Sequence, residues 1–267
     1  MIEPSRIVFY HPSGLRSFKE KLFLRIGAAI TKNGGEVIKT GAEALRHIRP
    51  DQIPLIGCSP ELTKLISEWR QSGRSWAYWD RGYARRVFAT WLPRAASVET
   101  SFYRVHLNSF QMQSIRNVPD DRWAALRTDV MPWQKNGGHI VVAAPTKSYS
   151  RFHETRDWIA DTIDALARVT DRQLVIRDKE SKRSLQSDLD GAHCLVTHGS
   201  IAAVESVILG CPVFVHPDSA AALVGRTDMN MVEKPVYPDR QPWLNALSYA
   251  QFNEAELVDG TLWRMLS

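Results

Sequence analysis

The chain has 267 residues, 44% of them hydrophobic and 24% charged, with 15 Gly and 14 Pro. These values are typical of a globular protein and exclude disordered, collagen-like and coiled-coil chains. No segment approaches the uninterrupted apolar length of a membrane span, and the N-terminus lacks the apolar run of a signal peptide. The three cysteines have no CxxC spacing, which excludes a disulfide framework or a Cys-based zinc site and favours a cytoplasmic location.

The formal net charge of +5 is unevenly distributed. Residues 1–135 hold 21 Lys and Arg against 12 Asp and Glu, whereas residues 136–267 hold 13 against 17. A positive field on one half of a protein attracts polyanions such as nucleic acid or an acidic polysaccharide. The alternative is that the imbalance serves solubility alone.

Apolar runs alternate with helical patterns along the first half. Phe18, Leu22, Ile26 and Ile30 recur every four residues and predict one amphipathic helix, and Pro60 opens a second that ends near Gln71. Strands are predicted at 6–10, 36–40, 53–57, 76–79 and 102–107.

Residues 114–138 hold Pro119, Pro132 and the pair Gly137-Gly138 around a short helix near 123–127, and they read as an interdomain crossing. A second alternation follows. Its predicted strands are 139–144, 173–176, 193–197 and 212–216, and its predicted helices are 155–168, 184–189, 201–209, 242–250 and 254–265.

Strands that alternate with helices predict right-handed crossovers and parallel sheets. Two such runs predict an α/β protein with two Rossmann-like domains, residues 1–135 and 136–267, that face each other across a cleft. The terminal helices are candidates to pack back on the first domain. Ligands of such sheets bind at the carboxyl ends of the strands.

The most informative motif is THGSIAAVESVILGCPVFVHP, residues 197–217. Gly199 permits a tight turn, Ser200 is a good N-cap, and the alanines that follow keep the first helical turn slim, so its amides are predicted to bind an anion. Glu205 lies one turn further, where a carboxylate can accept hydrogen bonds from a ribose diol. The alternative is an ordinary strand–helix–strand unit without a ligand, in which Glu205 reaches solvent.

This segment resembles the nucleotide-sugar half of GT-B glycosyltransferases, in which a strand, a small-residue turn, a Glu-bearing helix and a G-x-P-V strand hold the donor. Capsule-type glycosyltransferases and the phage DNA β-glucosyltransferases are similar here. The resemblance covers roughly residues 138–217, and it is only architectural over 1–137. It implies that the donor substrate is a nucleotide-diphosphate sugar, with a UDP-sugar as the leading candidate. It also implies that no further cofactor is required.

The resemblance also implies a set of donor-binding residues. Cations and hydroxyls in the loop after the strand at 139–144 suit a diphosphate, and the alternative is a solvated basic loop. Arg177 to Lys179 is alternatively a salt-bridged surface turn, and His216, at a strand end, is alternatively structural. The set is Lys147, Ser148, Arg151, Arg177, Lys179, Thr197, His198, Gly199, Ser200, Glu205 and Ser219.

The first half offers candidates for catalysis and acceptor binding. Asp80, at a strand end among aromatic residues, is the candidate general base, and His11 is its rival. Arg81 alternatively just neutralises Asp80. Arginines between aromatic residues can grip phosphates and stack on an extruded base, or they form the solvated face of a helix. The acceptor candidates are Ser13, Arg81, Tyr83, Arg85, His106 and Asn108.

Several motifs are absent from the sequence. It has no GxGxxG after the first strand, no GxxxxGK[ST], no HExxH and no DxD. We therefore expect neither a dinucleotide oxidoreductase nor a P-loop ATPase, and we expect diphosphate neutralisation by Lys, Arg and a helix N-terminus rather than a metal.

The leading hypothesis is a metal-independent GT-B-type glycosyltransferase whose acceptor is a hydroxymethylated pyrimidine in duplex DNA, acting in the host cytoplasm if phage-encoded. A polysaccharide or capsule-type glycosyltransferase is one alternative. A non-catalytic nucleotide- or nucleic-acid-binding module is the other.

Overall fold

The computed structural model describes residues 2–11, 17–84 and 102–266, with the side chains of 17–22 left out. The described chain forms two compact units. The first comprises the residues up to 84, together with 102–110 and 249–266, and the second comprises 111–248. The predicted division followed residue 135, whereas these units divide after Phe110 and after Ser248.

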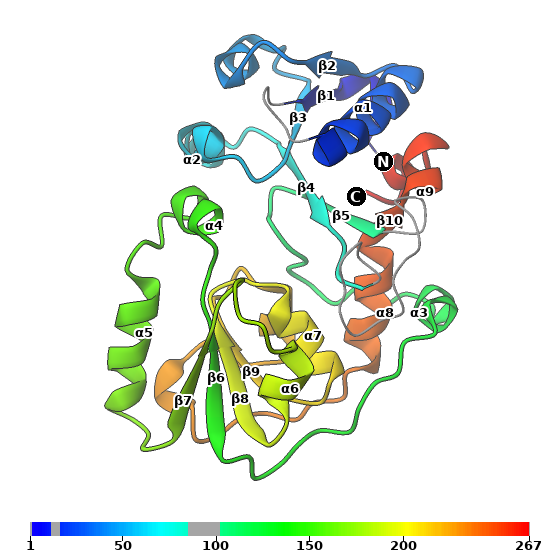
Figure 1. The fold of residues 1–267 in the computed structure, drawn as a ribbon. Coiled ribbons are helices and arrows are strands. Elements are labelled where there is room, and N and C mark those ends of the chain that lie inside the picture. The colour runs from blue at the N-terminus through cyan, green and yellow to red at the C-terminus, as the bar shows by residue number, and fades with distance from the viewer. Residues whose placement is uncertain (1, 12–16, 85–101, 267) are drawn as a thin grey trace. The chain divides into compact units, whose positions relative to one another are not determined.

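A six-stranded sheet organises the first unit (Figure 1). In spatial order its strands are β10 (Gln251–Asn253), β5 (Phe102–Leu107), β4 (Ala77–Arg81), β3 (Ile53–Ile56), β1 (Ile7–Tyr10) and β2 (Glu36–Ile38). The four strands β2, β1, β3 and β4 are parallel, as predicted. β1 and β3 are buried along their whole length, as expected of inner strands in a parallel sheet.

Two strands of the first unit depart from the predicted all-parallel pattern. β5 runs antiparallel to both of its neighbours, β4 and β10. β10 lies in a region that we predicted to be helical or irregular, between α8 (Gln241–Tyr249) and α9 (Glu254–Val258). Asn253 ends β10 and begins α9 through a capping box with Glu256, so one residue stops the strand and starts the helix.

The core of the first unit lies between the sheet and the helix α1 (Ser17–Lys32). Ile26 and Ile30 of the predicted helical stripe are buried there with Phe9, Trp79 and Tyr103. α9 also packs on α1. The remaining elements of this unit are η1 (Pro4–Arg6), η2 (Ala42–His47), η3 (Pro60–Leu62), α2 (Thr63–Ser72) and α10 (Thr261–Met265).

A four-stranded parallel sheet organises the second unit. In spatial order its strands are β7 (Gln173–Arg177), β6 (His139–Ala143), β8 (Ala192–Thr197) and β9 (Val213–Val215). One face of the sheet, with Ile140, Val142 and Val196, packs on Leu166 of α5 (Trp158–Ala167) and on Val232. The elements α6 (Leu185–Leu189) and α7 (Ala202–Ile208) also contact β8. The remaining elements are α3 (Asp121–Leu126), α4 (Lys147–Phe152), η5 (Ala220–Leu223) and η6 (Met229–Met231).

The parallel strands of the two units share one connectivity. In each, the first strand lies between the second and the third, with the fourth beyond the third: β2-β1-β3-β4 and β7-β6-β8-β9. This order creates a switch point at the carboxyl edge, between β1 and β3 in one unit and between β6 and β8 in the other. The chain is therefore a mixed α/β protein with parallel, Rossmann-like sheets.

None of the described helices has both the length and the apolar character needed to cross a bilayer.

Candidate functional site

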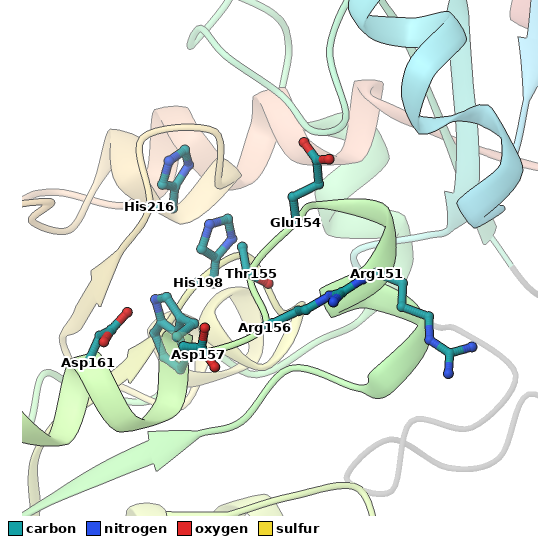
Figure 2. A pocket seen from close by; sticks show the side chains of 9 residues that line it. Arg151, Glu154, Thr155, Arg156, Asp157, Asp161, His198 and His216 are labelled. Carbon is teal, nitrogen blue, oxygen red and sulfur yellow. The ribbon is translucent and has the colours of Figure 1, made fainter.

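A cavity of about 570 Å³ opens at the carboxyl edge of the second unit's sheet (Figure 2). Its walls come from the segment after β6, from His198 directly after β8 and from His216 directly after β9. The cavity thus lies at the switch point, where the connections after β6 and β8 diverge and leave a crevice. The lining residues are Arg151, Glu154, Thr155, Arg156, Asp157, Trp158, Asp161, His198 and His216.

The wall after β6 consists of α4 and the turn that joins it to α5. We expected a loop here, whereas a helix occupies 147–152. Thr146 caps this helix, because its side-chain oxygen accepts the amide of Tyr149 at 3.2 Å. Glu154 has a φ of 54° in the left-handed region, and the chain turns there toward Asp157, the N-cap of α5. These local features place two arginines and three carboxylates around the cavity.

The imidazoles of His198 and His216 form the inner wall of the cavity, and the phenol of Tyr149, which is outside the lining, contacts one of them. The rings of His198 and His216 stack with their centroids 4.3 Å apart and 12° between their planes. The Tyr149 hydroxyl lies 3.0 Å from His198 Nδ1, at hydrogen-bonding distance. Tyr149 in turn stacks on His153 with 4.0 Å between the ring centroids. His198 is therefore held on one face and at one nitrogen before any ligand enters.

The imidazole of His198 is uncharged at neutral pH. Burial of the ring lowers the pKa of His198 from 6.5 to about 4, and the neighbouring His216 adds to this decrease, while Asp218 opposes it. A neutral imidazole carries one donor and one acceptor nitrogen, so His198 can orient a polar ligand without adding a charge to the cavity.

The wall after β6 carries charges of both signs. Arg151 and Arg156 supply two guanidinium groups, and Glu154, Asp157 and Asp161 supply three carboxylates. Within the described part of the chain, none of these five side chains forms an ion pair or a hydrogen bond. Figure 2 shows the Arg151 side chain extending away from the two imidazoles. Guanidinium groups bind phosphate and carboxylates accept hydrogen bonds from hydroxyls, so the cavity suits a ligand that carries both.

Of the predicted donor-binding residues, Arg151 and His198 line this cavity. Gly199 follows His198, and its Cα lies so close to the Tyr149 hydroxyl that an added Cβ would overlap with it. Lys147 and Ser148 are exposed in the first turn of α4, and Lys179 is exposed in the turn after β7. These three side chains are outside the lining of the cavity.

Three further predicted donor residues are engaged within the unit. The Thr197 hydroxyl donates to the carbonyl of Ala143 at 2.8 Å, and the Ser219 hydroxyl accepts the amide of Ala221 at 3.3 Å. Arg177 pairs with the buried Asp188, with 2.5 Å between Nη1 and Oδ2. These contacts join β8 to β6, cap η5 and join β7 to α6. They therefore account for the three residue types without a ligand.

The start of α7 differs from the predicted anion site. The N-cap is Ile201 rather than Ser200. Ser200 lies one residue earlier, where its hydroxyl accepts the amide of Ala202 at 3.2 Å and its carbonyl accepts the amide of Ala203 at 3.0 Å. Two of the amides that we expected to bind an anion are thus already satisfied. Glu205 is 3% exposed, so it does not reach solvent as the alternative required.

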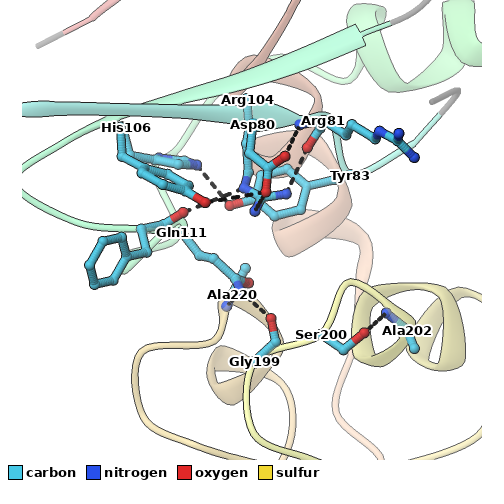
Figure 3. A network of polar contacts seen from close by, with 12 residues as sticks. Asp80, Arg81, Tyr83, Arg104, His106, Gln111, Gly199, Ser200, Ala202 and Ala220 are labelled. Atoms are coloured by element: carbon cyan, nitrogen blue, oxygen red, sulfur yellow. Dashed lines mark hydrogen bonds and ion pairs between the residues drawn. The ribbon is translucent and has the colours of Figure 1, made fainter. Parts of the chain in front are cut away.

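In the first unit, Asp80 is paired with a buried arginine (Figure 3). Asp80 and Arg104 are direct partners in the β4–β5 ladder, and Nη2 lies 2.8 Å from Oδ2. The Tyr78 hydroxyl and the amide of Arg81 also donate to the Asp80 carboxylate, at 3.3 and 2.8 Å. The neutralising cation is thus Arg104 across the ladder, rather than the adjacent Arg81.

The predicted acceptor residues occupy several environments. Tyr83 and His106 are buried and bonded to each other, with 2.8 Å between the hydroxyl and Nε2. Asn108 has a φ of 56°, and its side chain accepts the amide of Trp76 at 2.9 Å. The rival base, His11, is buried at the end of β1 against Phe23. Ser13 and Arg85 lie outside the described residues.

Six lining residues were not predicted from the sequence: Glu154, Thr155, Arg156, Asp157, Trp158 and Asp161. For His216, the sequence left a structural role as the alternative. One signal was available, because His198 directly follows the predicted strand 193–197, His216 is the last residue of the predicted strand 212–216, and parallel strands end at the same edge. No group of three His, Cys, Asp or Glu side chains among the described residues is arranged to hold a metal ion.

Comparison with protein-family profiles and with curated proteins finds no match. Among solved structures, the chain is similar to Thermosulfurimonas dismutans KpsC, beta Kdo 2,7 transferase, with a TM-score of 0.53 and 10% identity over 96% of this chain and 99% of that one. The beta Kdo 2,4 transferase of KpsC from the same organism has a TM-score of 0.48 and 10% identity over 98% of both chains. The first likeness indicates a shared fold.

Proposed function

We propose that the protein is a glycosyltransferase that binds an activated sugar in the cavity of its second unit. The observation that carries this proposal is the position of the cavity. It lies at the switch point of a Rossmann-like sheet, in a chain whose fold is similar along nearly its whole length to that of a Kdo transferase. A shared fold alone does not define an activity, so the chemistry of the cavity must support the assignment.

The groups around the cavity match the parts of a nucleotide sugar. Arg156 and Arg151 supply positive charge for a phosphate, and the carboxylates of Asp157 and Asp161 supply acceptors for hydroxyls. Trp158 and the His198–His216 stack supply flat surfaces. We further propose the two-domain GT-B organisation, with the donor in the second unit and the acceptor in the first.

In the proposed reaction, an acceptor hydroxyl oxygen forms a bond to the anomeric carbon, and the bond from that carbon to the donor phosphate oxygen breaks. The hydroxyl proton passes to a base, and the leaving nucleotide keeps the bonding electron pair. Asp80 is our candidate base, because it is a partly exposed carboxylate whose position is held by Arg104. Arginine side chains at the cavity stabilise the charge that develops on the leaving phosphate.

For the acceptor, we propose an acidic glycan. The positive excess in residues 1–135 favours a polyanion, and the fold likeness favours a sugar over a nucleic acid. Hydroxymethylated duplex DNA, which the charge excess also favours, is tested in the same assay.

The first experiment is a thermal-shift screen against UDP-, GDP- and CMP-linked sugars, including CMP-Kdo and UDP-glucose. A ligand at 100 times its Kd raises the apparent stability by about 2.7 kcal/mol. Sugars that stabilise the protein are then incubated with an acidic oligosaccharide or with hydroxymethylpyrimidine DNA, and the products are identified by mass spectrometry.

Arg156→Ala should abolish the thermal shift. The matched control is Arg168→Ala, which removes an exposed arginine at the other end of α5. If no nucleotide sugar stabilises the wild-type protein or is consumed, the proposed function is wrong.

A further inference from the structure

The side chain of Gln111 joins two loops at the carboxyl edge of the second unit (Figure 3). It is 4% exposed, and both ends of its amide are used. Nε2 donates to the carbonyl of Gly199 at 2.6 Å, and Oε1 accepts the amide of Ala220 at 3.0 Å. Gly199 follows β8, and Ala220 begins η5 after β9.

These two loops present the stacked imidazoles of the cavity. His198 immediately precedes Gly199, and His216 lies four residues before Ala220. The loops have one direct backbone bond, from the amide of His216 to the carbonyl of His198 at 2.9 Å. A second glutamine, Gln113, donates to the carbonyl of Asp218 at 2.9 Å.

We propose that Gln111 is a positioning residue for the cavity, which holds the loops after β8 and β9 at the separation that the His198–His216 stack requires. Gln111 is outside the lining of the cavity, so it acts through the two histidines. The identity of the ligand that binds in the cavity rests on the proposed function. The role of Gln111 in positioning the two histidines does not depend on it.

An amide is the side chain that this position requires. One end must donate to a carbonyl and the other must accept from an N–H, and each of these backbone groups is buried by the contact. A carboxylate keeps the acceptor but offers no donor to Gly199, and a leucine of similar size offers neither. A buried backbone group without a partner is costly, so the loops are expected to move until water or another group satisfies it.

The contact with Gly199 makes the cavity sensitive to substitution of Gln111. It lies between the Gln111 amide and the Tyr149 hydroxyl, and that hydroxyl contacts His198 Nδ1. A displacement of the Gly199 carbonyl therefore changes the Tyr149–His198 contact as well as the imidazole stack.

The test compares Gln111→Leu, which removes both bonds, and Gln111→Glu, which removes the bond to Gly199 alone. The matched control is Gln134→Leu, a half-buried glutamine of the same unit whose Nε2 is 3.5 Å from the carbonyl of Leu209, outside the cavity lining. The readout is the imidazole ¹H–¹⁵N NMR spectrum of the ligand-free protein, with the two signals assigned through His198→Asn and His216→Asn.

We expect Gln111→Leu to shift both imidazole signals and Gln111→Glu to shift that of His198 more, while Gln134→Leu leaves both in place. Titration with UDP and with CMP adds a second readout. Affinity for the nucleotide that binds should fall about tenfold in Gln111→Leu, because a buried group has lost its partner, and should be unchanged in the control.

Imidazole signals and nucleotide affinity that are the same in the Gln111 variants as in Gln134→Leu would overturn the proposal. If Gln111→Leu does not fold, Gln111→Glu decides by the same signals. If neither nucleotide binds the wild-type protein, it is the proposed function that loses support, and the imidazole signals still decide the role of Gln111.

Discussion

Arg104 holds the Asp80 carboxylate from directly across the β4–β5 ladder, with 2.8 Å between Nη2 and Oδ2. The Arg104 side chain is 6% exposed and the Asp80 side chain 39%. The guanidinium also donates to the carbonyls of Arg81 and Phe110, and it lies over the ring of Tyr83. The buried partner is thus fixed by several contacts, and it sets the position of the carboxylate that solvent can reach.

Asp80→Asn tests both roles of this pair. The substitution removes the carboxylate charge that pairs with the buried Arg104 at 2.8 Å, so the free energy of unfolding should fall by about 1–3 kcal/mol. If Asp80 is the base, the rate of transfer should fall about 10²–10⁴-fold while nucleotide affinity is retained. Chemical denaturation and turnover assays measure the two effects, with Asp51→Asn, at an exposed carboxylate of the same unit, as the control. Full turnover in Asp80→Asn would exclude this base.

The titration of His198 should differ from that of an ordinary histidine. Since its pKa is lowered to about 4 by burial and then by His216, the imidazole should remain unprotonated at pH 5.5 in an NMR titration. His216→Asn removes one of the two causes and should move the midpoint upward. A midpoint near 6.5 in the wild-type protein would contradict the burial that the structure gives this ring.

The same shift predicts a pH dependence of stability. Between pH 6.5 and 4 the unfolded chain holds a proton on His198 and the folded chain does not. This group therefore decreases the free energy of unfolding as the pH falls through that range and has no effect above it. The slope should be smaller in His198→Asn, which denaturation at several pH values measures. Equal slopes would indicate that the folded histidine is freely protonated.

Gly199→Ala should disrupt the inner wall of the cavity. The added Cβ overlaps with the Tyr149 hydroxyl, which must withdraw from His198. We expect a loss of about 1–3 kcal/mol in unfolding free energy. Gly138→Ala is the control, because its Cβ has no neighbour within 4 Å. Adding Tyr149→Phe to Gly199→Ala removes the overlapping oxygen and should recover part of the loss; no recovery would mean that the strain lies elsewhere.

The buried carboxylate of Asp188 should matter more for stability than for binding. It accepts Arg177 Nη1 at 2.5 Å and Arg183 Nε at 2.6 Å. Asp188→Asn leaves these arginines without a counter-ion and should cost about 3–5 kcal/mol in thermal or chemical unfolding. Arg183→Gln, at a side chain that is 60% exposed, should cost about 1 kcal/mol or less.

The neighbouring Asp190→Asn, at an exposed position, is the control for this cluster. Arg177→Gln then separates two interpretations of that arginine. A structural role predicts reduced stability with unchanged nucleotide affinity, whereas the donor-binding role predicted from the sequence requires weaker binding.

The sequence was most informative where a buried strand stands between two breakers. The segment 53–57 is an apolar run of this kind, and the observed strand Ile53–Ile56 ends one residue earlier. β10 could not be found in this way, because its three residues, Gln251-Phe252-Asn253, include one buried hydrophobic side chain and no periodicity. Its pairing partner, β5, lies about 150 residues away along the chain, so tertiary contact determines it.

The candidate site was predictable in position but not in detail. The rule that ligands meet the carboxyl ends of parallel strands selected His198 and Arg151, which line the cavity. The same rule selected Thr197 and Arg177, which are engaged by Ala143 and Asp188. Those partners come from other strands and helices, and no local pattern records which polar side chain the fold itself will use.

The threading of the chain also has a consequence for biosynthesis. The second unit is continuous from 111 to 248, whereas the sheet of the first unit receives β10 from residues 251–253. As the nascent polypeptide leaves the ribosome, β5 exposes an open edge until the whole second unit has emerged, and such edges promote aggregation. We therefore expect the second unit, although it is synthesised later, to fold before the sheet of the first unit is completed. The open edge of β5 is the point where a chaperone would be needed.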